Sequence, residues 1–282
     1  MSVKIVTDST CDLPEEIAGQ WDISVVPVYI NMDGKSYRDG VELSRSEFYE
    51  RLPKTNPLPT TSAPGIDAFI EVFRKLHAEG AEHILSIHIS KSLSNIANVA
   101  NLAAEAVEEE GIRVTVFDSG QLALGLGLLV LEAAQAAKAG SNHTQVLELL
   151  EKTASRTYSF ALLDTLDYLR RGGRISFLQH NVAMLLAIKP LLLMHAGELK
   201  MERVRTQRRA VERMLQMIRN LGAIEKIALI HAHASERLDS LREAAGDLFA
   251  DLELPFSGEV TSAIGAHVGP GSIGVICILK SS

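Results

Sequence analysis

The first half of the chain alternates short runs rich in β-branched residues with longer stretches whose apolar residues recur at helical spacing. The runs are typical of strands and lie at residues 3–7, 23–30, 83–89 and 113–117. Between them, Ser44 with Glu47 three residues later has the spacing of a helix N-cap, and Pro64 opens a helical pattern that includes Ile66 and Phe69. Strands that alternate with helices predict an α/β unit with a mainly parallel sheet.

The pattern changes near residue 157, where a strand and a short helix precede the basic turn RRGGR at residues 170–174. Beyond this turn we predict a β-hairpin from residues 189–194 and 199–204, then a helix from Gln207, a strand at 227–231, a further helix and two closing strands. A chain of 282 residues exceeds what one hydrophobic core usually organises. We therefore expect an α/β domain over residues 1–160 and an α+β domain over residues 161–282, with a cleft between them.

Composition and charge argue against several functional classes. The net charge of −7 opposes general nucleic-acid binding, which needs a basic face. Cys11 and Cys277 have neither metal-ligand nor redox spacing and suit a reducing compartment. The strongest apolar stretch, residues 122–134, is too short to span a bilayer and predicts a buried helix. Because the start of the chain does not resemble a signal peptide, we expect a cytoplasmic protein without nucleic acid and without stable membrane insertion.

Clusters of hydroxyl and carboxyl side chains are the first candidates for a site, because open parallel sheets bind ligands at the carboxyl ends of their strands. Four such clusters lie at residues 7–10, 59–64, 90–94 and 118–120. Thr61, Ser62 and Ser94 precede predicted helices, where backbone amides and the helix dipole favour a carboxylate or a phosphate. The alternative for each of these residues is an ordinary N-cap.

A glycine-rich turn near the end of the chain, GPGSIG at residues 269–274, matches the dinucleotide-binding pattern letter by letter. The pattern requires a helix after the glycines and an acidic residue about twenty positions later, and this chain has neither. We therefore predict a tight turn. The turn follows His267, whose imidazole is a candidate to hydrogen-bond an anionic or hydroxylic group in the cleft, with a purely structural role as the alternative.

Enzymatic roles have weaker support. Ser94 or Thr61 with His267 would make a serine hydrolase, but the chain has no G-x-S-x-G elbow and no assignable third residue to orient the imidazole. Asp8, at the end of the first strand, is a candidate metal ligand or phosphoryl acceptor, and a capping role is the favoured interpretation.

Histidine and arginine clusters complete the set of candidates. A metal site from His195, His231 and His233 lacks a carboxylate or thiol to complete it, so we predict no metal. The basic residues, which form either a patch for a phosphate or an acidic partner or ordinary solvated faces, are Arg170, Arg171, Arg174, Arg203, Arg205, Arg208, Arg209 and Arg213.

Several of these segments, in this order, resemble the DegV family along nearly the whole chain. They are TDSTCDLP at residues 7–14, PTTSAP at 59–64, SIHIS at 86–90, DYLRRGGRI at 167–175, VRT at 204–206 and GAHVGPG at 265–271. The resemblance implies an N-terminal Rossmann-like domain and a C-terminal α/β domain that together bind a long-chain fatty acid between them.

The same resemblance implies roles for individual residues. Thr61, Ser62, Ser94 and His267 occupy the family's positions around the fatty-acid carboxyl group. In members of the family the bound acid is phosphorylated by a separate ATP-dependent fatty-acid kinase that feeds phospholipid synthesis. Arg174 and Arg205 are then candidates to meet that kinase or the new phosphate, and no cofactor is implied besides the fatty-acid ligand.

One segment departs from the family pattern, because Asn95 stands where the family commonly has glycine after the serine of the third hydroxyl loop. A side chain there stands beside the expected headgroup site. The aliphatic runs at residues 122–131 and 184–193 are candidates to line the acyl tail, where each buried methylene contributes about 0.8 kcal/mol. Our first hypothesis is a non-catalytic carrier that presents a fatty acid to a kinase. The alternative is an acyl hydrolase or a phosphotransferase related to dihydroxyacetone kinase.

Overall fold

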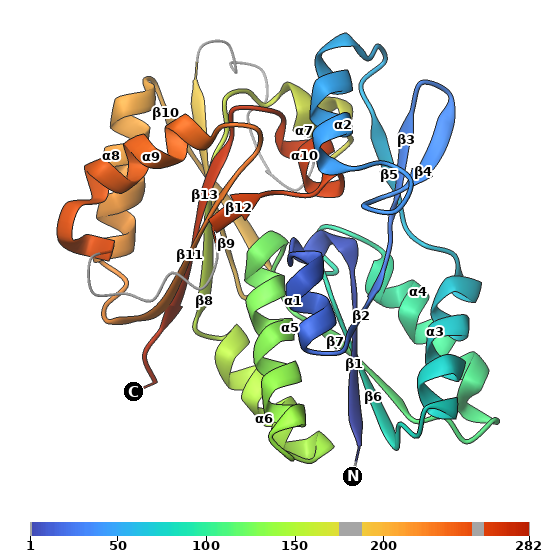
Figure 1. Ribbon diagram of the computed structural model, residues 1–282. Coiled ribbons are helices and arrows are strands. Elements are labelled where there is room, and N and C mark those ends of the chain that lie inside the picture. The colour runs from blue at the N-terminus through green and yellow to red at the C-terminus, as the bar shows by residue number, and fades with distance from the viewer. Residues whose placement is uncertain (1, 175–187, 250–256, 282) are drawn as a thin grey trace.

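The computed structural model describes residues 2–174, 188–249 and 257–281. Two main sheets lie side by side, with α5 (Ala123–Lys138) between them, and a small three-stranded sheet stands above the first (Figure 1). The predicted α/β class, with a parallel sheet followed by a separate mixed sheet, is confirmed.

The first sheet contains the four parallel strands β1 (Val3–Asp8), β2 (Ile23–Val26), β6 (His83–His88) and β7 (Val114–Asp118) in the order β2-β1-β6-β7. Helices α3 (Ile66–Ala78) and α4 (Ile96–Glu108) lie on one side of it, and α1 (Glu15–Gln20) and α5 on the other (Figure 1). A further helix, α6 (His143–Ala154), packs against α5.

The strand predicted over residues 23–30 is wrong as one element. It divides into β2, which ends at Val26, and β3 (Tyr29–Met32), which belongs to the small sheet. Pro27 lies at the division and has no amide hydrogen for a ladder. In the small sheet, β3 pairs antiparallel with β4 (Lys35–Arg38) and β5 (Thr60–Ser62).

Helix α2 (Arg45–Arg51) begins as predicted, because the Ser44 hydroxyl accepts a hydrogen bond from the Glu47 amide. A short 3-10 turn, η2 (Leu52–Lys54), follows it. Thr61 and Ser62, by contrast, do not cap a helix: they lie on β5, and α3 begins after Gly65 without a side-chain cap. The N-cap alternative for these two residues is therefore wrong.

The second sheet has six strands in the order β10-β9-β8-β13-β11-β12, with β11 and β12 parallel and the other pairs antiparallel. The strands are β8 (Thr157–Leu162), β9 (Lys189–His195), β10 (Glu198–Val204), β11 (Ile224–His231), β12 (Ser257–Glu259) and β13 (Ile273–Leu279). Helices α8 (Gln207–Arg219) and α9 (Ser235–Ala245) cover its outer face, and a 3-10 turn, η5 (Gly246–Phe249), follows α9. The division expected near residue 160 falls within β8 and stays a prediction.

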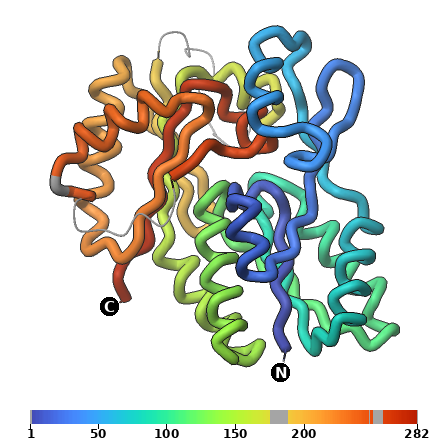
Figure 2. Tube along the Cα trace, in the orientation of Figure 1, coloured from blue at the N-terminus to red at the C-terminus, as the bar shows by residue number. Residues whose placement is uncertain are grey.

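The predicted hairpin is confirmed, because β9 and β10 pair from Glu198 and His195 onward. The expected pair of closing strands has a helix between them, α10 (Ser262–Val268). In Figure 2 the last helix lies beside segments from the first quarter of the chain, where α10 contacts α2 and β5. A second short helix, α7 (Asp167–Arg171), also contacts α10.

The apolar stretch predicted at residues 122–134 forms α5, whose first twelve residues are almost all buried. Two glycines that interrupt it permit close packing on both sides: a Cβ atom at Gly125 would overlap the Ser159 hydroxyl of β8, and one at Gly127 would overlap the carbonyl oxygen of Cys11. Among the described residues, no helix is long and apolar enough to cross a membrane.

Candidate functional site

A cavity lies between the two main sheets, with about 780 Å³ of unfilled space, part of it open to solvent. Its walls come from both halves of the chain, and α10 and β5 contribute side chains to it. Most of the lining is aliphatic. The polar and charged side chains among the lining residues are Thr10, Thr61, Ser62, Ser94, Arg174 and His267.

A second space of about 560 Å³ lies next to the first, along the inner face of the six-stranded sheet. The two share five aliphatic lining residues, Leu122, Leu192, Leu199, Ile264 and Val268. The lining of the second space is almost entirely apolar, because the hydroxyls of Ser159 and Ser272 donate to Gln121 Oε1 and to the Val268 carbonyl. We call the first space, which has the polar groups, the head compartment, and the second, apolar space the tail compartment.

Residues 122–131 of the predicted tail lining lie at the start of α5, and Leu122 and Ala123 reach the cavity. From the second predicted run, Leu192 lines both compartments. Residues 184–187 of that run lie outside the described residues.

His267, near the end of α10, reaches across the cavity to β5, where its Nε2 atom lies 2.8 Å from the Thr61 Oγ1 atom. Burial, reinforced by the positive charge of Arg174, lowers the pKa of His267 to about 4, so the imidazole is neutral at pH 7. Its Nδ1 atom is buried and has no hydrogen-bond partner among the described residues.

The neutral ring carries one proton, and a buried N–H without an acceptor is rarer than an acceptor without a donor. This favours the proton on Nε2 of His267, which then donates to Thr61. The hydroxyl hydrogen of Thr61 is left to donate to a ligand oxygen.

Two serines complete the hydroxyl set of the head compartment. Ser62 accepts a hydrogen bond from the Asn31 side-chain amide at 2.6 Å, which leaves its own hydroxyl hydrogen to donate elsewhere. Ser94 lies in the loop between β6 and α4, and its backbone amide donates to the Ser90 carbonyl at 3.1 Å. The structure therefore brings Thr61, Ser62, Ser94 and His267 to one compartment.

Asn95, which replaces the family glycine, does not line the cavity. It is exposed, and its side-chain oxygen accepts a hydrogen bond from the Asn98 amide at 2.6 Å along α4. The added side chain therefore leaves the space beside Ser94 open.

The two arginines singled out in the sequence occupy different places. Arg174 is half-buried, lines the head compartment and donates to the Gly172 carbonyl at 2.8 Å. Arg205 follows β10, is exposed and does not line the cavity. The structure does not bring Arg205 to the ligand space.

Gly172 is a site residue that was not predicted, and Thr10, from the candidate cluster at residues 7–10, is one that was not singled out within it. Thr10 lies in a 3-10 turn, η1 (Ser9–Cys11), directly after β1 and lines the head compartment. A Cβ atom at Gly172 would lie 2.5 Å from Nδ1 of His267, so only glycine leaves room for the imidazole. The Ser/Thr-rich loop after β1 indicates Thr10, whereas nothing in the local sequence indicates Gly172.

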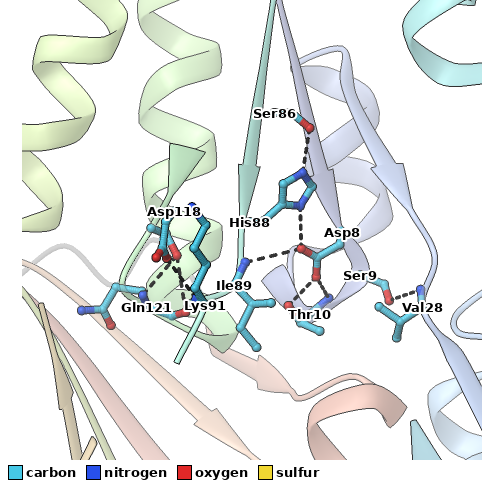
Figure 3. A network of polar contacts seen from close by, with 11 residues as sticks. Asp8, Ser9, Thr10, Val28, Ser86, His88, Ile89, Lys91, Asp118 and Gln121 are labelled. Carbon is cyan, nitrogen blue, oxygen red and sulfur yellow. Dashed lines mark hydrogen bonds and ion pairs between the residues drawn. The ribbon is translucent and has the colours of Figure 1, made fainter. Parts of the chain in front are cut away.

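Asp8 is fully buried at the end of β1 and holds a network of hydrogen bonds (Figure 3). Its carboxylate accepts from the His88 Nδ1 atom at 2.8 Å, from the amide and hydroxyl of Thr10, and from the Ile89 amide. His88 in turn accepts from the Ser86 hydroxyl at 2.7 Å. Asp8 also caps η1, as the favoured interpretation predicted.

This Ser86–His88–Asp8 arrangement has the hydrogen-bond order of a hydrolase triad, but all three side chains are fully buried and none lines the cavity. Of the predicted hydrolase pairs, Thr61 and His267 are in contact, but the Nδ1 atom of His267 faces Gly172 where a hydrolase would place a carboxylate.

Each histidine considered as a metal ligand has another partner. His195 stacks on Tyr158 with ring centroids 3.8 Å apart, and the Nδ1 atom of His231 accepts from the Ala234 amide. His233 pairs with Glu259 at 3.2 Å. In the described part of the chain no group of three or more such side chains is placed to hold a metal ion.

Comparison with known proteins agrees with this geometry. Residues 2–280 match the family model described as "Uncharacterised protein, DegV family". A DegV domain-containing protein from Streptomyces coelicolor is 37% identical over 277 residues, which cover 97% of each chain.

Solved structures agree as well. A DegV family protein from Thermus thermophilus, described by its fatty acid binding, is 32% identical with a TM-score of 0.87, and covers 99% of this chain and 100% of its own. DegV from Bacillus subtilis, a fatty acid binding protein, is 30% identical with a TM-score of 0.90 and the same coverage. The chain therefore belongs to the DegV family.

Proposed function

We propose that this protein binds one long-chain fatty acid, with the carboxylate in the head compartment and the acyl chain in the tail compartment. The observation that carries the proposal is that a space with polar groups lies next to an apolar one and shares five aliphatic lining residues with it. The structural relatives that bind fatty acids add support.

The proposed division of binding energy follows from the lining. Each methylene that moves from water into the aliphatic space contributes about 0.8 kcal/mol, so a dozen of them account for roughly 10 kcal/mol before the entropy of binding is subtracted. The hydroxyls orient the head: Thr61, oriented by His267, donates to one carboxylate oxygen, and Ser94 and Ser62 are placed to donate to the other. Arg174 supplies the positive charge.

We further propose that the carrier presents the carboxyl group to an ATP-dependent fatty-acid kinase that forms the acyl-phosphate. In this account Arg174, at the head compartment, meets the new phosphate, and the exposed Arg205 contacts the kinase. The protein itself performs no chemical step, and the fatty acid is its ligand in place of a cofactor.

The binding proposal is tested by titrating delipidated protein with oleate and palmitate in a calorimeter. A one-to-one complex with submicromolar Kd supports it, whereas no heat and no retained lipid with either acid rules it out.

The kinase proposal is tested by adding a purified fatty-acid kinase and ATP to the loaded protein. Arg205→Ala should raise the KM for the loaded carrier several-fold and leave the retained fatty acid unchanged. Arg113, exposed at the start of β7, supplies the control Arg113→Ala. Equal KM values for the Arg205 variant and the control would remove Arg205 from the kinase contact.

Acyl hydrolase or phosphotransferase activity is the competing proposal, and the residues that the structure describes offer it no accessible triad. Turnover of acyl esters or ATP by the purified protein alone would favour it over the carrier.

A further inference from the structure

We infer that Asp12 is a positioning residue for the fatty-acid site, which acts through α10 and sets how readily the cavity wall opens for the ligand to exchange. The inference rests on the proposed fatty-acid binding and adds a residue outside the cavity lining. It depends on what Asp12 holds, on what α10 does, and on the charges that surround Asp12.

Asp12 follows η1 directly and is 3% exposed, with backbone φ of 58°. Its Oδ1 atom accepts two hydrogen bonds from Thr261, one from the amide at 2.8 Å and one from the hydroxyl at 2.7 Å. Thr261 is the residue before α10. Asp12 thus ties the start of α10 to the end of β1, across 249 positions of sequence.

The helix that Asp12 holds forms a wall of the whole ligand space. Ile264 and Val268 line both compartments, and His267 reaches Thr61. Its middle is packed tightly, because a Cβ atom at Gly265 would lie 2.5 Å from the Tyr49 hydroxyl. Because α10 is held at both ends, release at Asp12 displaces its start, where Ala263 and Ile264 line the cavity, while the bond between His267 and Thr61 still holds its end.

The buried position of Asp12 is unfavourable for its ionised carboxylate at neutral pH. Its Oδ2 atom is buried without a hydrogen-bond partner among the described residues. Burial raises the pKa of Asp12 to about 6; Arg45 and the two Thr261 hydrogen bonds lower it, and the neighbouring carboxylate of Asp39 raises it. Two other ionisable groups face Asp12, Tyr49 and Cys11, and burial raises the pKa of both, so they stay neutral at pH 7.

The sign of the pH effect follows. The closed wall favours protonated Asp12, whereas a carboxyl group exposed by opening returns toward its ordinary pKa of 3.8. Opening therefore releases a proton and becomes easier as pH rises from about 4 to 6, and it levels off above pH 6. With these two pKa values, the opening equilibrium increases about tenfold between pH 5 and pH 7.5.

Asp12→Asn separates this account from a purely structural role. Asparagine has nearly the same shape, tolerates a positive φ, keeps an oxygen for Thr261 and carries no charge. The variant should therefore behave at every pH as the wild type does in acid, with slow exchange.

The experiment follows the transfer of cis-parinaric acid from the full-length protein to excess phosphatidylcholine vesicles by stopped-flow fluorescence from pH 5 to pH 7.5. The wild-type rate should rise about tenfold across this range. The transfer rate of Asp12→Asn should stay no higher than the wild-type rate at pH 5 across the whole range, without most of the tenfold increase. His267 stays buried against Thr61 in this opening, so its pKa remains near 4, below the range of the experiment.

Asp22→Asn is the matched control, because Asp22 also has a positive φ, of 53°, but is exposed. It should keep the wild-type profile. If Asp12→Asn also keeps that profile, Asp12 does not control the wall and the inference is wrong.

If Asp12→Asn fails to fold, Asp39→Asn decides the question. Burial raises the pKa of Asp39 as well, and Asp39 in its ionised form raises the pKa of Asp12, so its replacement should move the midpoint of the rate profile to lower pH. An unchanged midpoint overturns the inference. Failure of the wild type to bind the probe at any pH would instead overturn the proposed function, so the two failures are distinct.

Discussion

The imidazole of His267 and the hydroxyl of Thr61 lie 2.8 Å apart, although 206 positions separate the two residues in the chain. One comes from α10, after the last strand but one of the six-stranded sheet, and the other from the small sheet that stands above the parallel one. The contact closes the ligand space across the two halves of the molecule. Its strength should therefore decide how well a carboxylate is held.

Thr61→Val tests the hydroxyl directly, because valine keeps the shape of threonine and removes only the hydrogen bond. A hydrogen bond to a charged group contributes about 1.5–3 kcal/mol, so fatty-acid affinity should fall roughly tenfold to a hundredfold. Calorimetric titration of delipidated protein measures it. Thr60→Val on the same strand is the control, since Thr60 is exposed and does not line the cavity. Equal losses in both variants would contradict the proposed role of Thr61.

Gly172→Ala should weaken fatty-acid binding and also lower the stability of the fold. The new methyl group would lie 2.5 Å from Nδ1 of His267 and push the ring away from Thr61. Overpacking of this kind costs about 1–3 kcal/mol, and we expect affinity to fall about tenfold. Gly258→Ala, where a methyl group meets no atom within 4 Å, is the control. Unchanged affinity in the Gly172 variant would show that the ring position does not matter.

Gly125→Ala should destabilise the whole fold, because the methyl group would overlap the Ser159 hydroxyl and crowd Gln121 where α5 meets β8. A loss of about 1–3 kcal/mol in the free energy of unfolding is expected in urea denaturation. Gly19→Ala in α1, where a methyl group meets nothing within 4 Å, should be neutral or slightly stabilising. A neutral Gly125→Ala would mean that α5 does not lie as close to β8 as the structure places it.

Acid should destabilise the delipidated protein through His267. Its pKa is about 4 in the folded protein and 6.5 ordinarily, so the unfolded chain binds a proton that the folded protein does not. The contribution of His267 to the free energy of unfolding is therefore complete above pH 6.5 and decreases as pH falls toward 4. At pH 4.5 the decrease is about 2–3 kcal/mol. His267→Gln should lose this part of the pH dependence in urea unfolding at pH 7 and pH 4.5. The same slope in the variant would assign the acid effect to other groups.

Local patterns predicted most of the fold, because the parallel strands are short apolar runs, of which β1 and β6 are almost fully buried, and helices such as α3 have apolar residues at helical spacing. The failures have physical causes. Pro27 divides one apolar run between two sheets, a choice that depends on tertiary partners. The run at residues 262–268 is short, is buried on nearly every side and contains glycine, so it has no clear helical period, yet it forms α10.

Residue chemistry and the family resemblance predicted which polar residues lie in the head compartment, but they did not predict the shape of that compartment. Thr61, Ser62, Ser94 and His267 were candidates, and the structure places them around one space. Gly172 could not be predicted, because its importance lies in a side chain that it lacks and in a contact with His267 far along the chain. No feature of the sequence singles out Asp12, and only the fold shows that it holds Thr261.

Mass spectrometry of an organic extract of the freshly purified protein tests the central claim most directly, because an acyl chain enclosed between two sheets should leave slowly and survive purification. The account predicts close to one long-chain fatty acid per protein molecule, with much less recovered from Thr61→Val. An extract without fatty acid, together with delipidated protein that takes up neither oleate nor palmitate, would contradict it.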